Sequence, residues 1–174
     1  MSAIPVIKTD RLILRGPVAD DFPAYAAMWG DPAVTRFIGG APLSEEEAWG
    51  KFLRAFGQWA LLGFGSWAVT EKDSGARIGE VGFLEGRREI VPSLLGTPEC
   101  GWAFVTHAHG KGYATEAVRA ALAWGEEHFG KVRLACIIAP ENTASLRLAA
   151  KVGFRVAHHT IYKSEPTELL FRDP

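Results

Sequence analysis

Long hydrophobic runs are missing from this sequence of 174 residues. No stretch approaches the ~18 apolar residues that a membrane-spanning helix requires. The opening MSAIPVIKTD lacks the basic segment and apolar core of a secretion signal. We therefore expect a protein that has no membrane partner and works in the cytoplasm.

A strong net charge is also missing. The sequence has 19 Lys and Arg against 20 Asp and Glu, which gives a formal net charge of −1. A chain balanced in this way has no general attraction to nucleic acid or to an anionic membrane, so we expect no nucleic-acid partner. The length suits one domain, which we place at residues 1–174.

Cysteine is scarce, with Cys100 and Cys136 each inside an apolar run. A free cysteine behaves as a small hydrophobic residue, so buried, reduced thiols are favoured over a disulfide or a nucleophile. Three consecutive glutamates, 45–47, are interpreted as an acidic helix start and not as metal ligands. We expect no metal site.

The apolar periodicity predicts strands and helices along the whole chain, with no repeat, low-complexity tract or linker. Helices are predicted from a cap at Asp20 to Gly30, from a capping box at Ser44 to about Gln58, after the turn at 110–112, and over 143–151. Strands are predicted over 12–15, 66–70, 77–84, 99–105, 132–138, 154–156 and 168–171, and an irregular loop over 85–98. The order predicts an α/β (α+β) fold with a mixed, mostly antiparallel sheet of six to seven strands and helices on both faces.

The first two predicted helices carry many aromatic residues. Core packing accounts for most of them, and the rest would wall a substrate cleft, because ligand pockets are mostly apolar. The set comprises Trp29, Phe37, Trp49, Phe56 and Trp59.

A glycine-containing turn, His109-Gly110-Lys111-Gly112, joins the strand at 99–105 to the long helix that follows. Such a turn presents unpaired backbone N–H groups at the positive end of a helix dipole, which is an anion site commonly occupied by phosphate. By itself the signal is weak, because the turn lacks both the Walker A spacing and the three-glycine dinucleotide fingerprint. A purely structural turn fits the same residues.

Two longer motifs place this turn in context. GKGYATEA follows one predicted strand and ENTASLRLAAKVGF follows the next, and together they resemble the GNAT superfamily of acetyl-CoA-dependent N-acetyltransferases. The opening TDRLILR resembles the ribosomal-protein N-acetyltransferase (RimJ/RimL-type) branch. The resemblance covers nearly the whole chain and is weakest over 37–65 and 85–98. It implies the GNAT fold, splayed at a central parallel strand pair, with acetyl-CoA as cosubstrate.

The resemblance also implies which residues hold the cofactor. In the family the phosphate turn begins with Gln or Arg, and here that position is His107. The pantetheine arm would pair with the backbone of the preceding strand, and Asn142 would contact the cofactor as well as cap its helix. The implied set is Phe104, Val105, His107, His109, Gly110, Lys111, Gly112, Tyr113, Ala114 and Asn142.

The reaction needs a base, because a free alkyl amine is mostly protonated at pH 7. Glu99 matches the family position from which a carboxylate often serves, and Glu80 is the alternate. Ser145 is the candidate for contacting the leaving thiolate, although a hydrogen bond back to its own helix is an equal alternative. Many relatives carry a Tyr four residues later as general acid, whereas this chain has Ala149.

The leading hypothesis is an N-acetyltransferase that moves acetyl from acetyl-CoA to a primary amine by direct attack in a ternary complex. The alternative is a catalytically inactive acyl-CoA-binding or sensor protein, motivated by Ala149 and His107. A phosphoryl-transfer enzyme is a third hypothesis and has no Mg²⁺ motif behind it. The acceptor, a protein N-terminus or a small molecule, is not specified by the fold, and the branch includes homodimers.

Overall fold

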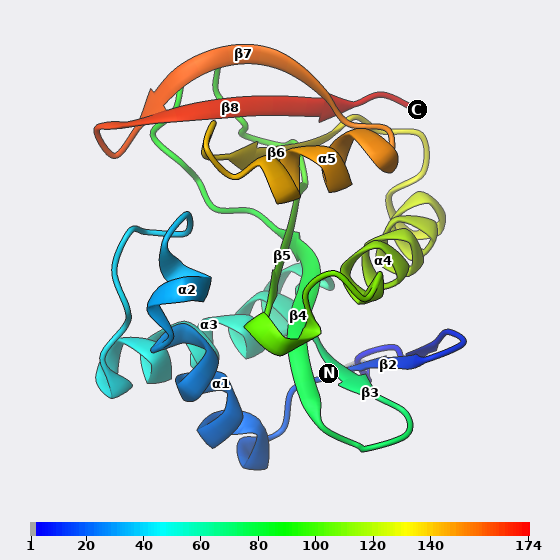
Figure 1. Ribbon diagram of the computed structural model, residues 1–174. Coiled ribbons are helices and arrows are strands. Elements are labelled where there is room, and N and C mark those ends of the chain that lie inside the picture. The colour runs from blue at the N-terminus through cyan, green and yellow to red at the C-terminus, as the bar shows by residue number, and fades with distance from the viewer. Residues whose placement is uncertain (1–2) are drawn as a thin grey trace.

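One sheet of eight strands runs through the computed structural model, which describes residues 3–174. The strand order is β1-β2-β3-β4-β5-β6-β8-β7, and every neighbouring pair is antiparallel except β5 with β6 (Figure 1). The strands are β1 (Ile7–Lys8), β2 (Leu12–Arg15), β3 (Ser66–Glu71), β4 (Arg77–Leu84), β5 (Glu99–Phe104), β6 (Leu134–Ile138), β7 (Arg155–Tyr162) and β8 (Glu165–Arg172). The mixed, mostly antiparallel sheet is confirmed. Its additional strand is β1, which is too short to show an alternating pattern in the sequence.

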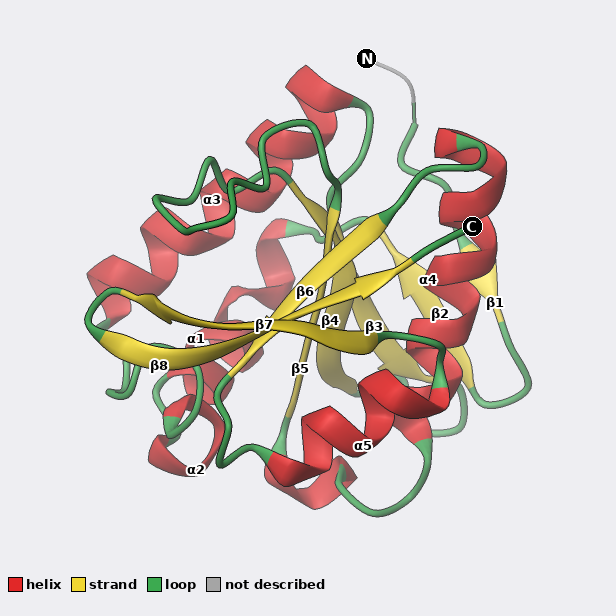
Figure 2. Ribbon diagram, turned by 90° about the horizontal axis from the view of Figure 1, so that it is seen from above, coloured by secondary structure: helices red, strands yellow, loops and turns green. Residues whose placement is uncertain are grey.

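Helices cover both faces of the sheet, as expected (Figure 2). One face carries α1 (Phe22–Trp29), α2 (Pro32–Thr35) and α3 (Glu45–Leu62), and the other carries α4 (Tyr113–Phe129) and α5 (Thr143–Lys151). None of these helices combines the length and the hydropathy needed to span a bilayer, judged over residues 3–174.

The side chains of β5 alternate between the two faces of the sheet and pack into a separate hydrophobic core on each face. Phe104 packs in the core beneath α4, together with the half-buried Trp102. Ala103 packs on the opposite face with α1 and α3, together with the half-buried Val105. Successive side chains of a strand point to opposite faces, so β5 presents one set of residues to each helical layer.

The start of α3 is the predicted capping box. Ser44 Oγ accepts the Glu47 N–H at 3.3 Å, and the Glu47 carboxylate accepts the Ser44 N–H at 2.8 Å. The helix continues past Gln58 to Leu62, because Trp59 packs edge-on against Trp67 with ring centroids 4.9 Å apart.

The predicted cap of the first helix at Asp20 is wrong. Asp20 is exposed within a 3₁₀ turn over Ala19–Asp21, and α1 begins only at Phe22. Asp21 is the buried carboxylate here, and it forms a two-pronged ion pair with Arg15 at 2.6 and 2.7 Å. The pairing with β2 therefore fixes where this helix can start.

The last two strands are longer than their sequence pattern indicates. β7 pairs with β8 from Arg155 to Tyr162, and a tight turn at Lys163 and Ser164 joins them. β7 is an edge strand with mostly exposed side chains, so its polar sequence resembles a loop. The irregular segment at 85–98 is confirmed, and its Ile90 and Leu94 pack against β6 and β8.

Both cysteines are free and buried, as expected. Burial raises the pKa of the Cys100 thiol to about 12 and also raises that of Cys136. Neither is ionised near pH 7, so neither is suited to act as a nucleophile.

Candidate active site

β5 and β6 diverge immediately after they meet. Their register contains one residue pair, Glu99 with Ala135, and beyond it the two strands separate (Figure 1). On the other side of β5, the Val105 N–H donates to the Ile78 carbonyl at 3.0 Å. Because hydrogen-bonded pairs alternate along an antiparallel ladder, the main-chain groups of Trp102 and Phe104 face away from β4, into the opening.

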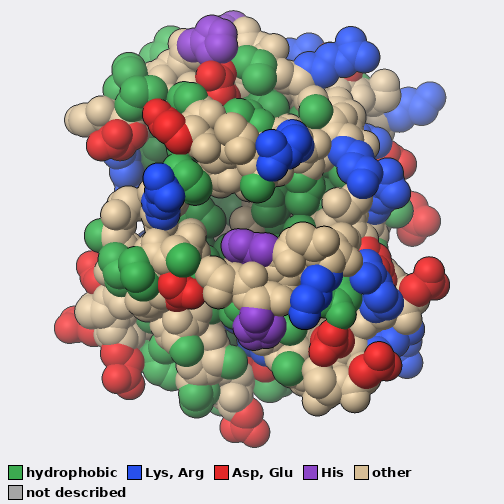
Figure 3. All heavy atoms as spheres, viewed as in Figure 1, with side chains coloured by type: hydrophobic (Ala, Val, Ile, Leu, Met, Phe, Trp, Pro, Cys, Tyr) green, Lys and Arg blue, Asp and Glu red, His purple; other side chains and the backbone are tan. Residues whose placement is uncertain are grey.

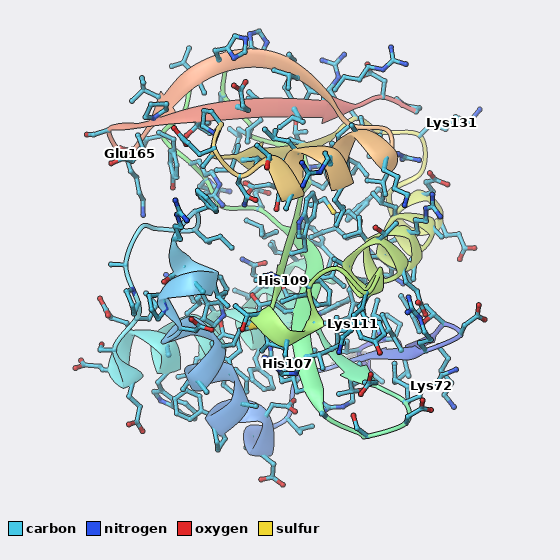
Figure 4. All side chains as sticks on the ribbon, viewed as in Figure 1. Lys72, His107, His109, Lys111, Lys131 and Glu165 are labelled. Atoms are coloured by element: carbon cyan, nitrogen blue, oxygen red, sulfur yellow. The ribbon has the colours of Figure 1, made fainter. Side chains whose placement is uncertain are left out.

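The opening is visible on the molecular surface. Figure 3 shows a hollow in the middle of this face, with hydrophobic side chains inside it and a histidine at its lower rim. Figure 4 identifies this histidine as His109 and shows His107 and Lys111 near it at the turn before α4. The hollow therefore reaches from the splayed strands to the predicted phosphate turn.

Both main-chain groups of Val105 already form hydrogen bonds within the protein. Its N–H is donated to Ile78, and its carbonyl accepts the Ala108 N–H at 3.0 Å. The ring of His109 donates from Nε2 to the Phe104 carbonyl at 2.9 Å. The groups that remain directed into the opening are the N–H groups of Trp102 and Phe104 and the carbonyl of Trp102.

The predicted phosphate turn is open to solvent. Gly110 and Gly112 have φ values of 74° and 81°, a backbone region that glycine adopts without strain. The first hydrogen bond of α4 runs from the Glu116 N–H to the Gly112 carbonyl at 3.1 Å, so the preceding N–H groups have no partner within the helix. Exposed residues here are His107, His109, Gly110, Lys111 and Gly112, with Tyr113 and Ala114 half-buried.

Arg11 holds this turn from outside. Its guanidinium donates to the Lys111 carbonyl at 2.8 Å and to the Glu116 carboxylate at 2.7 Å, and it stacks on the Tyr113 ring at 4.5 Å. Thr9 donates to the other Glu116 oxygen at 2.6 Å. Burial raises the pKa of Glu116, but these hydrogen bonds and the Arg11 charge lower it more. Glu116 therefore joins the segment before β2 to the start of α4.

Sequence reasoning did not identify Arg11 as part of the site. The two segments TDRL and GYATEA come into contact because β2 lies beside the start of α4. Both segments were recognised in the sequence, but their contact depends on this packing. The Tyr113 hydroxyl donates to Glu71, so this side chain points to β3 and not along the turn.

At the other end of the opening, α5 begins with Asn142 as its cap, since Asn142 Oδ1 accepts the Ser145 N–H at 3.1 Å. The Ser145 hydroxyl oxygen accepts the Trp102 indole N–H at 3.3 Å. This contact leaves the hydroxyl hydrogen of Ser145 available to another acceptor. Trp102 was not among the predicted site residues, because an aromatic in a strand is usually read as core.

Glu99 is buried and fully engaged by Arg88. The guanidinium reaches Oε2 at 2.6 Å and Oε1 at 2.7 Å, and it also donates to the Tyr162 hydroxyl at 3.0 Å. Burial lowers the pKa of Arg88, but its bonds to Glu99 raise it more. Both oxygens of the first-choice base are therefore held in a bidentate ion pair.

Glu80 is held more loosely. Among residues 3–174 it forms an ion pair with Arg77 alone, at 3.3 Å, and its side chain is 15% exposed. It lies opposite Ala103 on β5, on the face covered by α1 and α3. Of the two carboxylates, Glu80 has more lone pairs available to a substrate.

The arrangement fits a long phosphate-bearing thioester. The turn offers unpaired N–H groups to a pyrophosphate, and the N–H groups of Trp102 and Phe104 offer pairing to an amide-containing arm. Asn142 and Ser145 lie at the start of α5, after the end of β6, and Ser145 contacts Trp102 of β5. Aligned along one opening, these groups can bind such a substrate in an extended form.

Known proteins share both the sequence pattern and the fold. Residues 11–155 match the family model described as Acetyltransferase (GNAT) domain. A Bacillus subtilis protein named as the uncharacterized N-acetyltransferase YoaA is 26% identical over 87% of this chain and 83% of its own. A solved structure described as a GNAT-family acetyltransferase from Bordetella pertussis is 33% identical, with a TM-score of 0.84 over 97% of this chain and 99% of that one. A structure described as a ribosomal-protein-serine acetyltransferase from Vibrio cholerae, 21% identical with a TM-score of 0.77 and full coverage of both chains, shares the fold.

Proposed function

This chain belongs to the GNAT family of acetyltransferases, and from that premise we propose that it transfers acetyl from acetyl-CoA to a primary amine by direct attack in a ternary complex. The observation that carries the proposal is the opening between β5 and β6, which ends at the exposed start of α4. The RimJ/RimL-type branch is supported by the TDRLILR opening, but fold likeness at 21% identity does not specify an acceptor.

We assign cofactor binding to the residues along this opening. The N–H groups at 110–114 would hold the pyrophosphate, with His107 and Lys111 adding polar contacts at the rim. The N–H groups of Trp102 and Phe104 would pair with the pantetheine arm, and His109 would keep the Phe104 carbonyl occupied. The side-chain amide of Asn142 would donate to the same arm.

The chemistry that acetyl-CoA supplies is an activated carbonyl carbon with a thiolate leaving group. The contribution of Ser145 would be a hydrogen bond to that sulfur. Its oxygen accepts from the Trp102 indole, which turns the hydroxyl hydrogen outward. Ser145 would take over the role of the Tyr that many relatives use. The residue at that Tyr position is Ala149, which is fully buried and has no hydrogen-bond donor.

The proton of the attacking amine needs an acceptor, and the contacts favour Glu80 over Glu99. Arg88 occupies both oxygens of Glu99, whereas Glu80 has one long contact to Arg77. Glu80 would take the proton directly or through one water. Glu99 would anchor Arg88 at the wall of the site.

The test is steady-state acetyl transfer to a panel of amines, followed as thiol release, with acetyl-CoA binding measured by calorimetry. Glu80→Gln should lower kcat about a hundredfold without weakening acetyl-CoA binding, whereas Glu99→Gln should mainly raise the acceptor KM. If Glu99→Gln lowers kcat and Glu80→Gln does not, the assignment of the base is reversed. Binding without turnover of any amine would establish the inactive acyl-CoA-binding alternative, and no binding at millimolar acetyl-CoA would reject the function.

A further inference from the structure

Five residues form a continuous chain of contacts, from Lys51 to Glu80, on the face covered by α1 and α3. The Lys51 ammonium lies 4.1 Å above the Trp29 ring, and the Trp29 and Tyr25 rings are 6.3 Å apart. The Arg77 guanidinium lies 4.9 Å above the Tyr25 ring and pairs with Glu80, whose charge acts on Lys51. We call Tyr25, Trp29, Lys51, Arg77 and Glu80 the acceptor-side cluster.

The acceptor-side cluster has more donors than acceptors. Trp29 Nε1 and Arg77 Nε are buried and have no hydrogen-bond partner among residues 3–174. Trp29 is 3% exposed and the Arg77 side chain is 5% exposed, so both donors are largely shielded from bulk water. Buried polar groups are nearly always satisfied in native structures, so donors of this kind are available to a ligand that accepts hydrogen bonds.

The acceptor-side cluster also has an excess of positive charge. Lys51 and Arg77 face one carboxylate, Glu80, because Arg88 already neutralises Glu99. Burial lowers the pKa of Lys51, and the charges of Arg54 and Arg88 lower it further, while those of Glu80 and Glu99 offset this only in part. A half-buried ammonium without a bonded partner is costly until an anion approaches it.

The position of the acceptor-side cluster relates it to the incoming amine. Glu80 lies opposite Ala103, near the end of β5 that leads into the turn, on the face away from α4 and α5. The Trp29 and Tyr25 rings and the Arg77 guanidinium connect Lys51 to Glu80. A molecule whose amine reaches Glu80 can therefore place a second group near Lys51.

We propose that Lys51, with the free donors of Trp29 and Arg77, binds a carboxylate carried by the acceptor, so that the acceptor is a small amino acid or a similar zwitterionic amine. The assignment rests on the proposed function and specifies its substrate class. A polyamine or an aminoglycoside would bring cations to a cluster that already has an excess of them. A protein N-terminus offers a neutral amide at the place of the carboxylate.

The test compares acceptors that differ only in this charge. Each of the twenty L-amino acids is assayed beside its carboxamide, with spermidine and Ser- or Ala-initiated peptides as other classes. For the best amino acid, kcat/KM should exceed that of its carboxamide by about tenfold to a hundredfold, the value of a charge-assisted hydrogen bond. Lys51→Met should remove this preference by lowering turnover of the acid alone, and Lys51→Arg should restore most of it.

The matched control is Lys131→Met, because Lys131 is an exposed lysine in the loop before β6 (Figure 4). The acid preference should be unchanged in this variant. The proposal is overturned if the carboxamide, spermidine or a peptide is the better acceptor of the wild-type enzyme, or if Lys51→Met keeps the preference. Those outcomes leave acetyl transfer itself intact, whereas absence of turnover with every amine would reject the proposed function together with this assignment.

Discussion

Two glutamates with similar neighbours in the sequence, Glu80 and Glu99, have different roles in this molecule. Glu80 and Glu99 both lie in strands beside glycine or cysteine, and the sequence ranks Glu99 first as the base. In the structure, Arg88 from the irregular segment at 85–98 reaches Glu99, while Glu80 retains a loose contact. The engagement of Glu99 depends on Arg88, which its own strand does not contain, whereas Glu80 contacts Arg77 of its own strand.

Asp21 allows a pH-dependent prediction at this scale. Burial raises its pKa, but Arg15 and the Val18 N–H lower it more, so the folded value lies below the unfolded value. The stabilisation is therefore present above the unfolded pKa, about 3.9, and is lost as pH falls through the folded pKa. Asp21→Asn should cost about 2 kcal/mol of unfolding free energy at pH 7 and much less near pH 3. Urea denaturation at both pH values measures this difference.

The neighbouring exposed residue gives the control for this measurement. Asp20→Asn should change the unfolding free energy little at either pH. A cost for Asp21→Asn that is equal at pH 7 and pH 3 would contradict the role assigned to the ion pair with Arg15.

Among the elements, the start of α4 depends on the segment before β2. Arg11 bonds the Lys111 carbonyl and Glu116 at once, which fixes the exposed turn relative to the first helical residues. The turn has no side-chain cap of its own. The conformation of the predicted phosphate site is thus supported by residues about a hundred positions earlier.

Removing this support should weaken phosphate binding selectively. Arg11→Met should lower kcat/KM for acetyl-CoA by about tenfold, because the N–H groups of the turn lose their fixed arrangement. For S-acetylpantetheine, which lacks the nucleotide and pyrophosphate, kcat/KM should change by no more than about twofold. A loss that is equal for both donors would indicate general destabilisation instead. Arg133→Met is a matched control, since Arg133 also stacks on an aromatic ring, at 4.9 Å, and pairs with a carboxylate at 2.6 Å.

At the scale of the whole molecule, the splayed strand pair divides the sheet into two parts. The strands β1 to β5 lie on one side of the opening and β6, β8 and β7 on the other. The two parts meet at the pair Glu99 with Ala135, and Ala135 packs in a small cluster with Ile90 and Leu94. A ligand that binds along the opening contacts both parts and should stabilise the native state as a whole.

Thermal unfolding measures this stabilisation. A ligand at a hundred times its Kd adds about 2.7 kcal/mol to the free energy of unfolding. For a chain of this length, that corresponds to a rise in Tm of about 5–10 °C. Acetyl-CoA should produce this shift. ATP at the same concentration should produce little, and a shift equal to that of acetyl-CoA would favour the phosphoryl-transfer hypothesis.

The sequence by itself determined the elements whose signals are local. The capping box at Ser44, the start of α4 after Gly112 and the cap at Asn142 each depend on a few consecutive residues, and all three occur where the pattern indicates. Motif spacing likewise indicated the family. The helix start near Asp20 and the edge strand β7 differ from expectation, because a tertiary ion pair and an exposed sheet edge override the local pattern.

Only the tertiary structure decided which side chains remain available to a substrate. The bidentate hold of Arg88 on Glu99, the support of Arg11 for the turn and the surplus donors around Lys51 all join residues distant in sequence. The physical reason is that hydrogen bonds and ion pairs depend on distances of about 3 Å, which only the packed chain defines. Residue type shows which chemistry a side chain can perform, and packing determines whether that chemistry is already satisfied.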